Sequence, residues 1–424
     1  MRLLIALSLY RLLLPLLFIA AFPGWIVKML RRGGIGTQLA ERVGIYTCPA
    51  DQEPCGAVHF HAVSVGEAIL ALKLIREWQL TSPNRRFVLA TGTATGHALA
   101  SAAQIPGLRV TYAPLDFPWM LRRYLSRFEP SQIVLIEAEI WPLLLLTCQR
   151  RKIPVRLVNA RMSPRSARRF RRFATWLQPI FRLLDCVATQ EPADTEIWLA
   201  LGLPPHKIHT TGSLKFDPSC GPQPTQRPAF QALLDSFGRN RPIILAASTH
   251  PGEEALIANA IHRAAPNALA LIAPRHAERR STVVSDLEKI GLHPILRSKP
   301  PAQFPSTILC FVIDTTGELC DWTAHADAVI IGKSFLSTGG QNPCEAILAS
   351  KPVIFGPHME NFQPLASQLL LAGGARSAHD LESLSAAIRC AIDPKLNGEI
   401  TQIASSLLAR HHGATQRILA LLTA

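Results

Sequence analysis

Three glutamates stand where the chain leaves short apolar runs, and a carboxylate held at such a point can act as a general base. Glu67 follows the turn at Gly66, and Glu137 and Glu139 directly follow the apolar run 133–136. A general base takes the proton from an attacking hydroxyl group. Glu67 also fits the first turn of a helix, whose dipole stabilises an acid, and position alone favours this structural interpretation. Glu137 and Glu139, which would face one way on a continuing strand, also fit ion pairs with later arginines.

A second set of candidates lies in turns that mostly belong to the second half of the chain. Backbone N–H groups at a helix start can bind a phosphate, and a nearby glutamate can accept hydrogen bonds from ribose hydroxyls. A Gly-Gly pair alone usually marks a tight turn, but four such turns at the strand ends of one domain indicate a nucleotide site. They carry no metal or glycine-rich phosphate motif, so we expect no metal and no other cofactor. The candidates are Lys215, Ser248, Arg275, His276, Ser334, Gly339, Gly340, Asn342 and Glu345.

A third feature is the density of arginine in residues 150–172, combined with the absence of any acidic residue from 140 to 184. Such a cationic stretch fits lipid headgroups or a phosphorylated substrate. A merely solvated face would mix both signs of charge. Few aromatic residues interleave the arginines, which disfavours single-stranded nucleic acid as the partner. The residues assigned to this basic surface are Arg161, Arg165, Arg168 and Arg169.

The N-terminal segment 3–27 is almost entirely apolar, and three interpretations compete for it. A signal peptide is disfavoured because the apolar run continues past its small residues, and a buried core helix remains an alternative. A membrane anchor over residues 1–30 fits best, with Trp25 at the interface. The basic residues that follow, Lys28, Arg31 and Arg32, predict that the rest of the chain is cytoplasmic. Whether the anchor spans the bilayer or lies on it stays open.

Composition bounds the class of protein that must position these residues. The chain has 424 residues, of which 48% are hydrophobic and 17% charged, and its net charge is +14. These values exclude a disordered chain, and a single long apolar stretch excludes a polytopic membrane protein. The nine cysteines are odd in number and never spaced as Cys-x-x-Cys, so neither a disulfide framework nor a zinc site is indicated.

Short apolar runs alternate with helical stretches, which predicts an α/β protein with parallel sheets. The first series ends near residue 211, and the Pro-rich segment 217–228 is typical of a linker. A second series follows. We therefore expect two Rossmann-like doubly wound domains, 31–216 and 229–424, with the last helix free to pack back on the first, and with ligands at the carboxyl ends of the strands. The predicted strands are 57–63, 86–91, 133–136, 155–159, 186–189, 208–211, 243–247, 268–273, 308–313, 328–331 and 353–355.

Eight segments in series resemble the signature blocks of one enzyme family: HAVSVGE, EAEIWP, NARMSPRS, GSLKFD, ASTHPGEE, PRHAER, GGQNPCE and GPHMENF. They are similar to those of the 3-deoxy-D-manno-octulosonic acid (Kdo) transferases of lipopolysaccharide biosynthesis. The resemblance implies a B-type glycosyltransferase fold, CMP-Kdo as donor and the lipid A precursor as acceptor. It also implies work at the cytoplasmic face of the inner membrane, with anionic lipids as neighbours and no nucleic acid partner.

The resemblance also assigns roles by position. Glu67 matches the proposed general base and Glu137 a second acid tied to activity. The positions that match those associated with CMP are Lys215, Arg275, His276, Gly339, Gly340, Asn342 and Glu345. One base with direct attack implies inversion at the anomeric carbon. Departures occur at Ser213, Ala138, Gln341 and Lys333, and the number of Kdo residues added stays open.

Two other functions remain open on the residues alone. One is a different nucleotide-sugar enzyme, such as a UDP-sugar transferase or epimerase. The other is a non-enzymatic protein that binds anionic lipid or nucleic acid through its positive charge.

Overall fold

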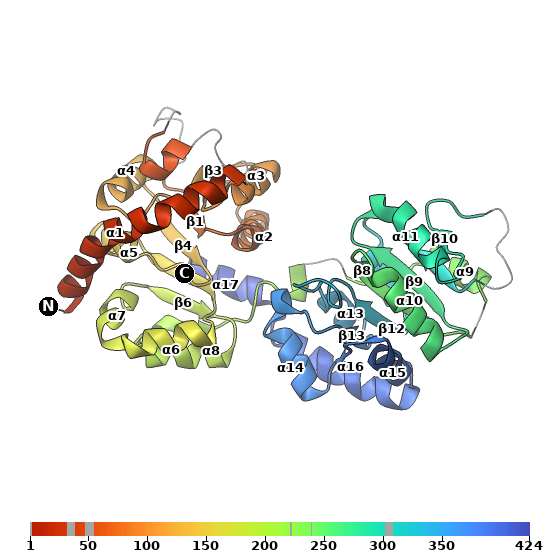
Figure 1. The fold of residues 1–424 in the computed structure, drawn as a ribbon. Coiled ribbons are helices and arrows are strands. Elements are labelled where there is room, and N and C mark those ends of the chain that lie inside the picture. The colour runs from red at the N-terminus through yellow and green to blue at the C-terminus, as the bar shows by residue number, and fades with distance from the viewer. Residues whose placement is uncertain (1, 32–38, 47–54, 221–222, 239, 302–307) are drawn as a thin grey trace. The chain divides into compact units, whose positions relative to one another are not determined.

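The computed structural model describes residues 2–31, 39–46, 55–220, 223–238, 240–301 and 308–424, and these form two compact units (Figure 1). Unit 1 comprises Met1–Cys220 and Gly413–Ala424, and unit 2 comprises Gly221–His412. The chain therefore passes between units inside the segment predicted as a linker.

Unit 1 is built on a seven-stranded sheet in the order β3-β2-β1-β4-β5-β6-β7, and all of its strand pairs are parallel. The chain starts in the middle, winds outward to one edge and then returns for the other half. Its topological switch point therefore lies between β1 and β4. The strands are β1 (Val58–Ala62), β2 (Phe87–Thr91), β3 (Leu108–Tyr112), β4 (Gln132–Ile136), β5 (Val155–Ala160), β6 (Cys186–Thr189) and β7 (Ile208–Thr210).

Helices cover both faces of this sheet, which is why its central strands are buried from end to end. On β1, Phe60 packs against Trp78 of α2 on one face. On the other face, His59 Nδ1 lies 2.8 Å from the hydroxyl of Tyr124 on α4. The helices are α1 (Arg2–Arg31), α2 (Val65–Thr81), α3 (Ala94–Ala102), α4 (Pro118–Phe128), α5 (Pro142–Arg150), α6 (Pro164–Arg172), α7 (Ala174–Phe181), α8 (Pro192–Ala200) and α17 (Ala414–Thr423).

Unit 2 repeats the plan with a seven-stranded sheet in the order β10-β11-β9-β8-β12-β13-β14 and with parallel pairing throughout. Its switch point lies between β8 and β12. The prediction of two doubly wound α/β domains is confirmed. The strands are β8 (Ile243–Thr249), β9 (Leu269–Pro274), β10 (Ile295–Leu296), β11 (Cys310–Val312), β12 (Ala328–Ile331), β13 (Val353–Phe355) and β14 (Arg376–Ser377).

Its core lies between the sheet and the pair α10 and α15, with Ile244, Ile257 and Ile388 fully buried there. The helices are α9 (Pro228–Ser236), α10 (Glu253–Ala264), α11 (Arg280–Glu288), α12 (Leu319–His325), α13 (Cys344–Leu348), α14 (Leu365–Ala372), α15 (Leu381–Ala391) and α16 (Pro394–Ala409).

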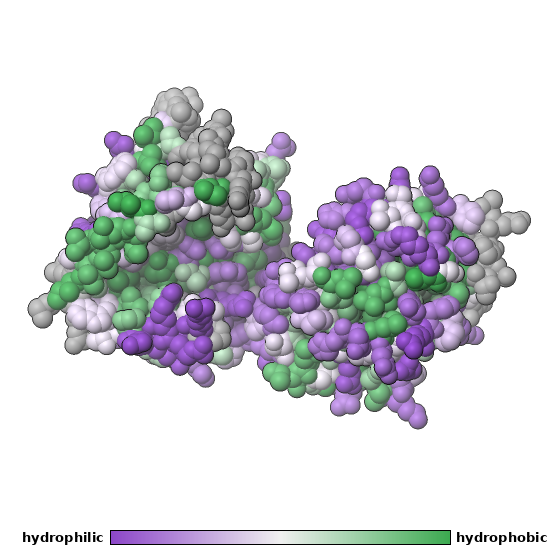
Figure 2. Space-filling view, in the orientation of Figure 1, coloured by the Kyte–Doolittle hydropathy of each residue, from purple (hydrophilic) through white to green (hydrophobic). Residues whose placement is uncertain are grey.

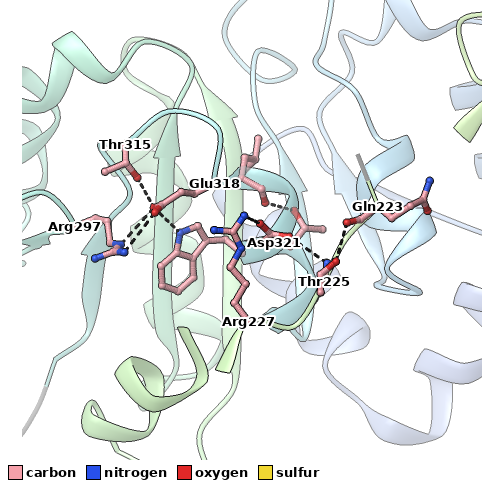
Figure 3. A network of polar contacts seen from close by, with 10 residues as sticks. Gln223, Thr225, Arg227, Arg297, Thr315, Glu318 and Asp321 are labelled. Carbon is pink, nitrogen blue, oxygen red and sulfur yellow. Dashed lines mark hydrogen bonds and ion pairs between the residues drawn. The ribbon is translucent and has the colours of Figure 1, made fainter. Parts of the chain in front are cut away.

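The predicted linker 217–228 is not a free connection. Its second half is fastened to unit 2, where Arg227 forms an ion pair with Asp321 of α12 and the Thr225 N–H donates to the same carboxylate at 3.3 Å (Figure 3). Beside them, Glu318 accepts hydrogen bonds from Thr315 and Arg297. Residues 217–220 belong to unit 1, so each described end of the segment is attached to one unit.

Helix α1 covers the segment predicted as a membrane anchor. Among the residues that the structure describes, no helix is long and apolar enough to cross a membrane. The anchor is therefore not confirmed and stays a prediction.

The C-terminal helix α17 is part of unit 1, and Asp217 is the residue that fastens its start. The Asp217 carboxylate accepts N–H bonds from Gly413 at 3.0 Å and from Thr415 at 2.7 Å, and also from Ser219 at 3.0 Å. At the other end of α17, the Leu422 carbonyl accepts from the side chains of Gln132 and Arg156. Burial acts to raise the pKa of Asp217, but hydrogen bonds from Thr415 and Ser219 outweigh burial, so that pKa lies below its ordinary value.

We predict that Asp217→Ala loosens the attachment of α17. The change leaves buried N–H groups without an acceptor, which costs about 1–3 kcal/mol. Hydrogen exchange of residues 413–424 should quicken roughly tenfold or more. Because the pKa of Asp217 is depressed in the folded chain, its contribution is present at neutral pH and lost as pH falls through that value. Glu196→Ala, an exposed change on α8, is the control, and equal exchange in both variants would contradict the assignment.

Candidate functional site

Unit 1 gathers a cluster of carboxylates at its switch point. Glu67 lies in the first turn of α2, after β1, and Glu137 and Glu139 follow β4, the adjacent strand. Burial raises the pKa of Glu137, and the charge of Glu67 raises it further, while Arg161 and Lys215 act in the opposite direction. These five charged side chains therefore lie at one edge of the sheet, beyond the carboxyl ends of β1, β4, β5 and β7.

Glu67 takes part in the capping of its own helix, as the structural interpretation expected. Ser64 is the N-cap residue of α2, and its hydroxyl lies 2.8 Å from Glu67 Oε1. Glu67 Oε2 accepts the Val63 N–H at 2.7 Å. The side chain is buried, and these donors fix its orientation. Its assignment as general base stays a prediction.

Glu137 and Glu139 were expected to face one way if the strand before them continued. The strand does not continue through them. β4 ends at Ile136, and Glu137 adopts a positive φ of 61°. The chain turns there, so Glu139 reaches the N-terminal side of α5, where its Oε2 accepts the Trp141 indole N–H at 2.9 Å. Burial, reinforced by the charge of Glu67, raises the pKa of Glu139 to about 7. A carboxyl group with that pKa exchanges its proton at neutral pH, which suits acid–base chemistry.

Lys215 lies in unit 1 with the carboxylates, at the end of the first domain as predicted, and its role in binding CMP stays a prediction. Asn159, at the end of β5, holds the loop that carries it. Asn159 adopts a positive φ of 54°, and its Oδ1 accepts the Leu214 N–H at 2.9 Å. Asn159 was not among the predicted site residues, because only the fold brings residues 159 and 214 together.

The basic surface predicted from the sequence is exposed. Arg161 follows β5, and Arg165, Arg168 and Arg169 lie on α6. The guanidinium of Arg169 lies 5.4 Å from the ring centre of Phe170.

Unit 2 holds a cavity of about 230 Å³ that brings together four of the predicted nucleotide-binding residues. Ser248 ends β8 and Arg275 follows β9, whereas Asn342 and Glu345 come from the loop after β12 and from α13. Gln341, which departs from the family pattern, also lines the cavity. The cavity lies at the switch point between β8 and β12, where doubly wound sheets bind ligands. Burial raises the pKa of Glu345.

Three other predicted residues serve the loop instead of the cavity. The Gly339 N–H donates to Glu360 at 2.6 Å, and the Gly340 N–H donates to the Lys333 carbonyl at 2.9 Å. Neither N–H is free for a phosphate, so that expectation is wrong and the tight-turn interpretation holds. Ser334 is fully buried, and its hydroxyl bridges the Ile331 carbonyl and the Gly356 N–H.

His276 does not line the cavity either. Its side chain is 57% exposed, and its Nδ1 lies 3.6 Å from Glu278. It directly follows Arg275 of the lining, and its ring centre is 6.3 Å from that of His250, whose Nε2 lies 3.3 Å from Nε2 of the lining residue Gln341. In the described parts of the chain, no group of three His, Cys, Asp or Glu side chains could hold a metal ion.

Glu253 organises the loops around this cavity, although the sequence analysis gave it no role. The carboxylate is fully buried in the first turn of α10 and accepts the His250 N–H at 2.9 Å. It also accepts the N–H groups of Lys333 at 2.6 Å and Phe335 at 3.0 Å. One side chain thus ties the loop after β8 to the loop after β12. The signal in the sequence was an acid in the first turn after a Gly, which alone is typical of any helix start.

Each unit can therefore supply one half of a group-transfer reaction. Unit 1 presents carboxylates with raised pKa values beside two cations, which can accept a proton and hold an anion. Unit 2 presents a small polar cavity at which Arg275 can neutralise negative charge.

Comparison with known proteins identifies the family. Residues 37–218 match the family model described as 3-deoxy-D-manno-octulosonic-acid transferase (kdotransferase). The chain is 35% identical to the 3-deoxy-D-manno-octulosonic acid transferase of Bordetella pertussis, covering 93% of this chain and 94% of the relative. It is 32% identical to that of Haemophilus influenzae, covering 91% and 90%.

Among solved structures, MurG of Acinetobacter baumannii shares the fold, with a TM-score of 0.56 and 12% identity over 87% of this chain and 99% of that chain. The match over most of both sequences, with the signature segments at both switch points, shows that the chain belongs to the 3-deoxy-D-manno-octulosonic acid transferase family.

Proposed function

We propose that this protein transfers Kdo from CMP-Kdo to a hydroxyl group of the lipid A precursor, a tetraacyldisaccharide bisphosphate. The observation that carries the proposal is the carboxylate cluster at the switch point of unit 1, in a chain of the Kdo transferase family. Transfer to an alcohol needs a group that removes its proton, and this cluster supplies three candidates. CMP-Kdo as donor and the lipid as acceptor are the compounds that the resemblance of the signature segments implies.

Unit 2 is the proposed donor site. In the described residues, the exposed guanidinium of Arg275 has no acidic partner, so it is available to the phosphate of CMP. Breaking the bond to CMP leaves a developing negative charge on that phosphate, and a fixed cation stabilises it in the transition state. Glu345 and Asn342 supply hydrogen-bond acceptors and donors for the ribose and the base.

Unit 1 is the proposed acceptor site, with Glu67 as general base. Its capping bonds hold the carboxylate in one orientation, which is what a base needs to meet a hydroxyl in reacting geometry. Direct attack by that hydroxyl on the anomeric carbon breaks the bond to CMP in one step and inverts the configuration. Glu137 and Glu139 lie close enough for their charges to repel Glu67, and Lys215 and Arg161 hold the cluster against that repulsion.

We place the reaction at the cytoplasmic face of the inner membrane. Support comes from the exposed arginines of α6 and from the large apolar side chains exposed on α1, among them Leu12, Leu16 and Ile19. Arginines near an anionic membrane surface and apolar side chains within it both favour binding.

The assignment of Glu67 as general base is tested by substitution. Glu67→Gln should lower kcat for Kdo transfer by roughly 10²–10⁴-fold, because an amide cannot take the proton. Binding of CMP, measured by calorimetry, should be unchanged, since the donor cavity is in unit 2. Glu77→Gln, on the same helix, is the matched control and should retain full rate. A near wild-type rate in Glu67→Gln would sink the assignment.

The pH dependence of transfer tests the cluster as a unit. Because the pKa of Glu139 is raised to about 7, its carboxylate form increases as pH rises through neutrality. If this charge holds the acceptor or assists the base, kcat/KM rises over the same range. Glu139→Gln removes the titration and should flatten that limb of the profile. A profile that keeps its shape in Glu139→Gln would exclude Glu139 from the reaction.

The donor site is tested at Arg275. Arg275→Ala should weaken CMP binding by about 10–100-fold, the usual loss for a hydrogen bond to a charged group. Arg263→Ala, an exposed arginine at the end of α10, removes the same charge from unit 2 and should leave binding unchanged. Competition by UDP as strong as that by CMP would favour the alternative of a UDP-sugar enzyme.

A further inference from the structure

Unit 1 contains an apolar cavity of about 790 Å³ that none of the steps above uses. It lies between α1 and α7, and we call it the α1–α7 slot; its lining includes Leu9, Leu13, Trp141, Phe173 and Leu177. In Figure 2 a hydrophobic band runs along α1, with a recess beside it and a group of hydrophilic side chains over α6. A cavity of this size is large enough for a sizeable organic ligand.

One wall of the slot is a stripe of α1. Ile5, Leu9 and Leu13 recur every four residues and so lie along one face of the helix. The neighbouring face, which includes Leu7 and Tyr10, packs on the core of unit 1. The side chains that line the slot are thus held beside the domain, but the domain does not fill the space next to them, and Leu9 remains 55% exposed.

The Tyr10 hydroxyl fixes α1 in this position. It donates a hydrogen bond of 3.0 Å to Asp116, and the same carboxylate accepts the N–H groups of Leu143 and Leu144 at the start of α5. Phe18 adds a contact farther along α1, where its ring meets that of Phe117 edge-on. The wall is therefore fastened to the helix that follows the Glu137–Glu139 turn.

The opposite wall joins apolar and cationic surface. Trp176 and Leu177 line the slot from α7, Phe170 lines it from the end of α6, and Phe173 lines it from the position between the two helices. The arginines of α6 point to solvent on the same short segment. An occupant that fits both surfaces carries an apolar chain and a negative charge.

The floor of the slot is the turn that carries the carboxylates. Glu139 and Trp141 both line it, and they are hydrogen-bonded to each other. Tyr10 donates to Asp116, which leaves Glu139 Oε1 and the Trp176 indole N–H as the side-chain groups of the described lining that can still form hydrogen bonds. A peptide would bring far more N–H and C=O groups than these two can satisfy, at a cost in free energy. An acyl chain needs no such partner.

We propose that the α1–α7 slot binds one acyl chain of the acceptor lipid, with its phosphorylated head held by the arginines of α6. The inference rests on the proposed function, which it deepens by assigning a specificity site for the acceptor. Because Glu139 lines the slot, an occupied slot delivers the sugar head of the lipid to the carboxylate cluster. The slot then selects acceptors by the presence and length of that chain.

The test uses quenching of tryptophan fluorescence by alkyl phosphates brominated on the chain, added to the purified full chain in the absence of donor. Trp141 and Trp176 line the slot, so a bound probe should quench the emission, and Trp176→Phe should reduce the quenched amplitude. Affinity should rise about fourfold per added methylene until the slot is full. The tetraacyldisaccharide bisphosphate should displace the probe competitively, whereas a membrane phospholipid should not.

Two variants each place a charged side chain in the slot, one on each wall. The same loss of binding in both is not explained by a folding defect at a single position. Leu9→Asp and Phe173→Asp should each weaken probe binding by about tenfold or more, since a carboxylate repels both the chain and the phosphate. Leu80→Asp changes a leucine of α2 that is 76% exposed and does not line the slot, and this variant should bind within about twofold of the parent protein. Circular dichroism and thermal melting verify that all three variants are folded.

The outcomes separate the slot from the reaction. Quenching that is displaced by the acceptor, in a protein that transfers no Kdo, would refute the proposed function and leave the slot standing. Absence of quenching, or equal quenching in Leu9→Asp and Leu80→Asp, would refute the slot whatever the transfer rate. Displacement by phospholipid as effective as by the acceptor would also overturn it, because the slot would then be a general membrane contact.

Discussion

Both candidate sites depend on a buried carboxylate in the first turn of the helix that follows the first strand of each unit. In unit 1 this residue is Glu67, which binds the Val63 N–H and the Ser64 hydroxyl. In unit 2 it is Glu253, which binds N–H groups of two different loops. In unit 2 these two loops leave adjacent strands at the switch point, beyond the last hydrogen bonds of the sheet, so another group has to hold them. A buried acid can do so, because the N–H groups satisfy its charge and it satisfies them.

The two units differ in whether this interaction leaves a carboxylate oxygen without a backbone donor. Both carboxylate oxygens of Glu253 accept backbone N–H groups, so Glu253 only fixes the shape of the proposed donor cavity. Glu67 Oε1 meets only a hydroxyl, and a hydroxyl can turn to donate elsewhere. The same local arrangement is thus purely structural in unit 2, whereas in unit 1 it leaves one oxygen able to accept a proton.

The alternation of apolar runs and helices predicted the layered α/β fold, because strands buried on both faces are apolar throughout. It predicted the edge strand β7 but failed for the other three edge strands. β3 contains Arg109 and is half exposed at its start, and β10 and β14 are only two residues long, too short for a pattern. Sheet order follows from contacts between distant segments, which a local pattern does not record.

The site was predicted unevenly for the same reason. Ser248, Arg275, Asn342 and Glu345 follow strands of one sheet, and parallel strands bring their carboxyl ends together, so position in the chain was enough. The glycines at 339 and 340 were misjudged, because a phosphate loop and a closed turn have the same composition. What distinguishes them is the partner of each N–H, and Glu360 lies twenty residues farther on. The turn at Glu137 was also missed, since a positive φ at a glutamate has no sequence signal.

Charge distribution explains why the carboxylate cluster and the arginine-rich helix belong together. No acidic residue follows Glu139 until Asp185, so the cluster faces a surface of one sign. Alone, that surface would trap any anion. Three glutamates at its edge repel a phosphate that approaches the sheet and leave the arginines of α6 as its favourable position. Under the proposed function, the phosphate of the acceptor is held on α6, while an uncharged hydroxyl of the same molecule is the group that can approach Glu67. In that proposal, opposed charges on neighbouring elements orient the acceptor, and the α1–α7 slot sets the distance at which it is held.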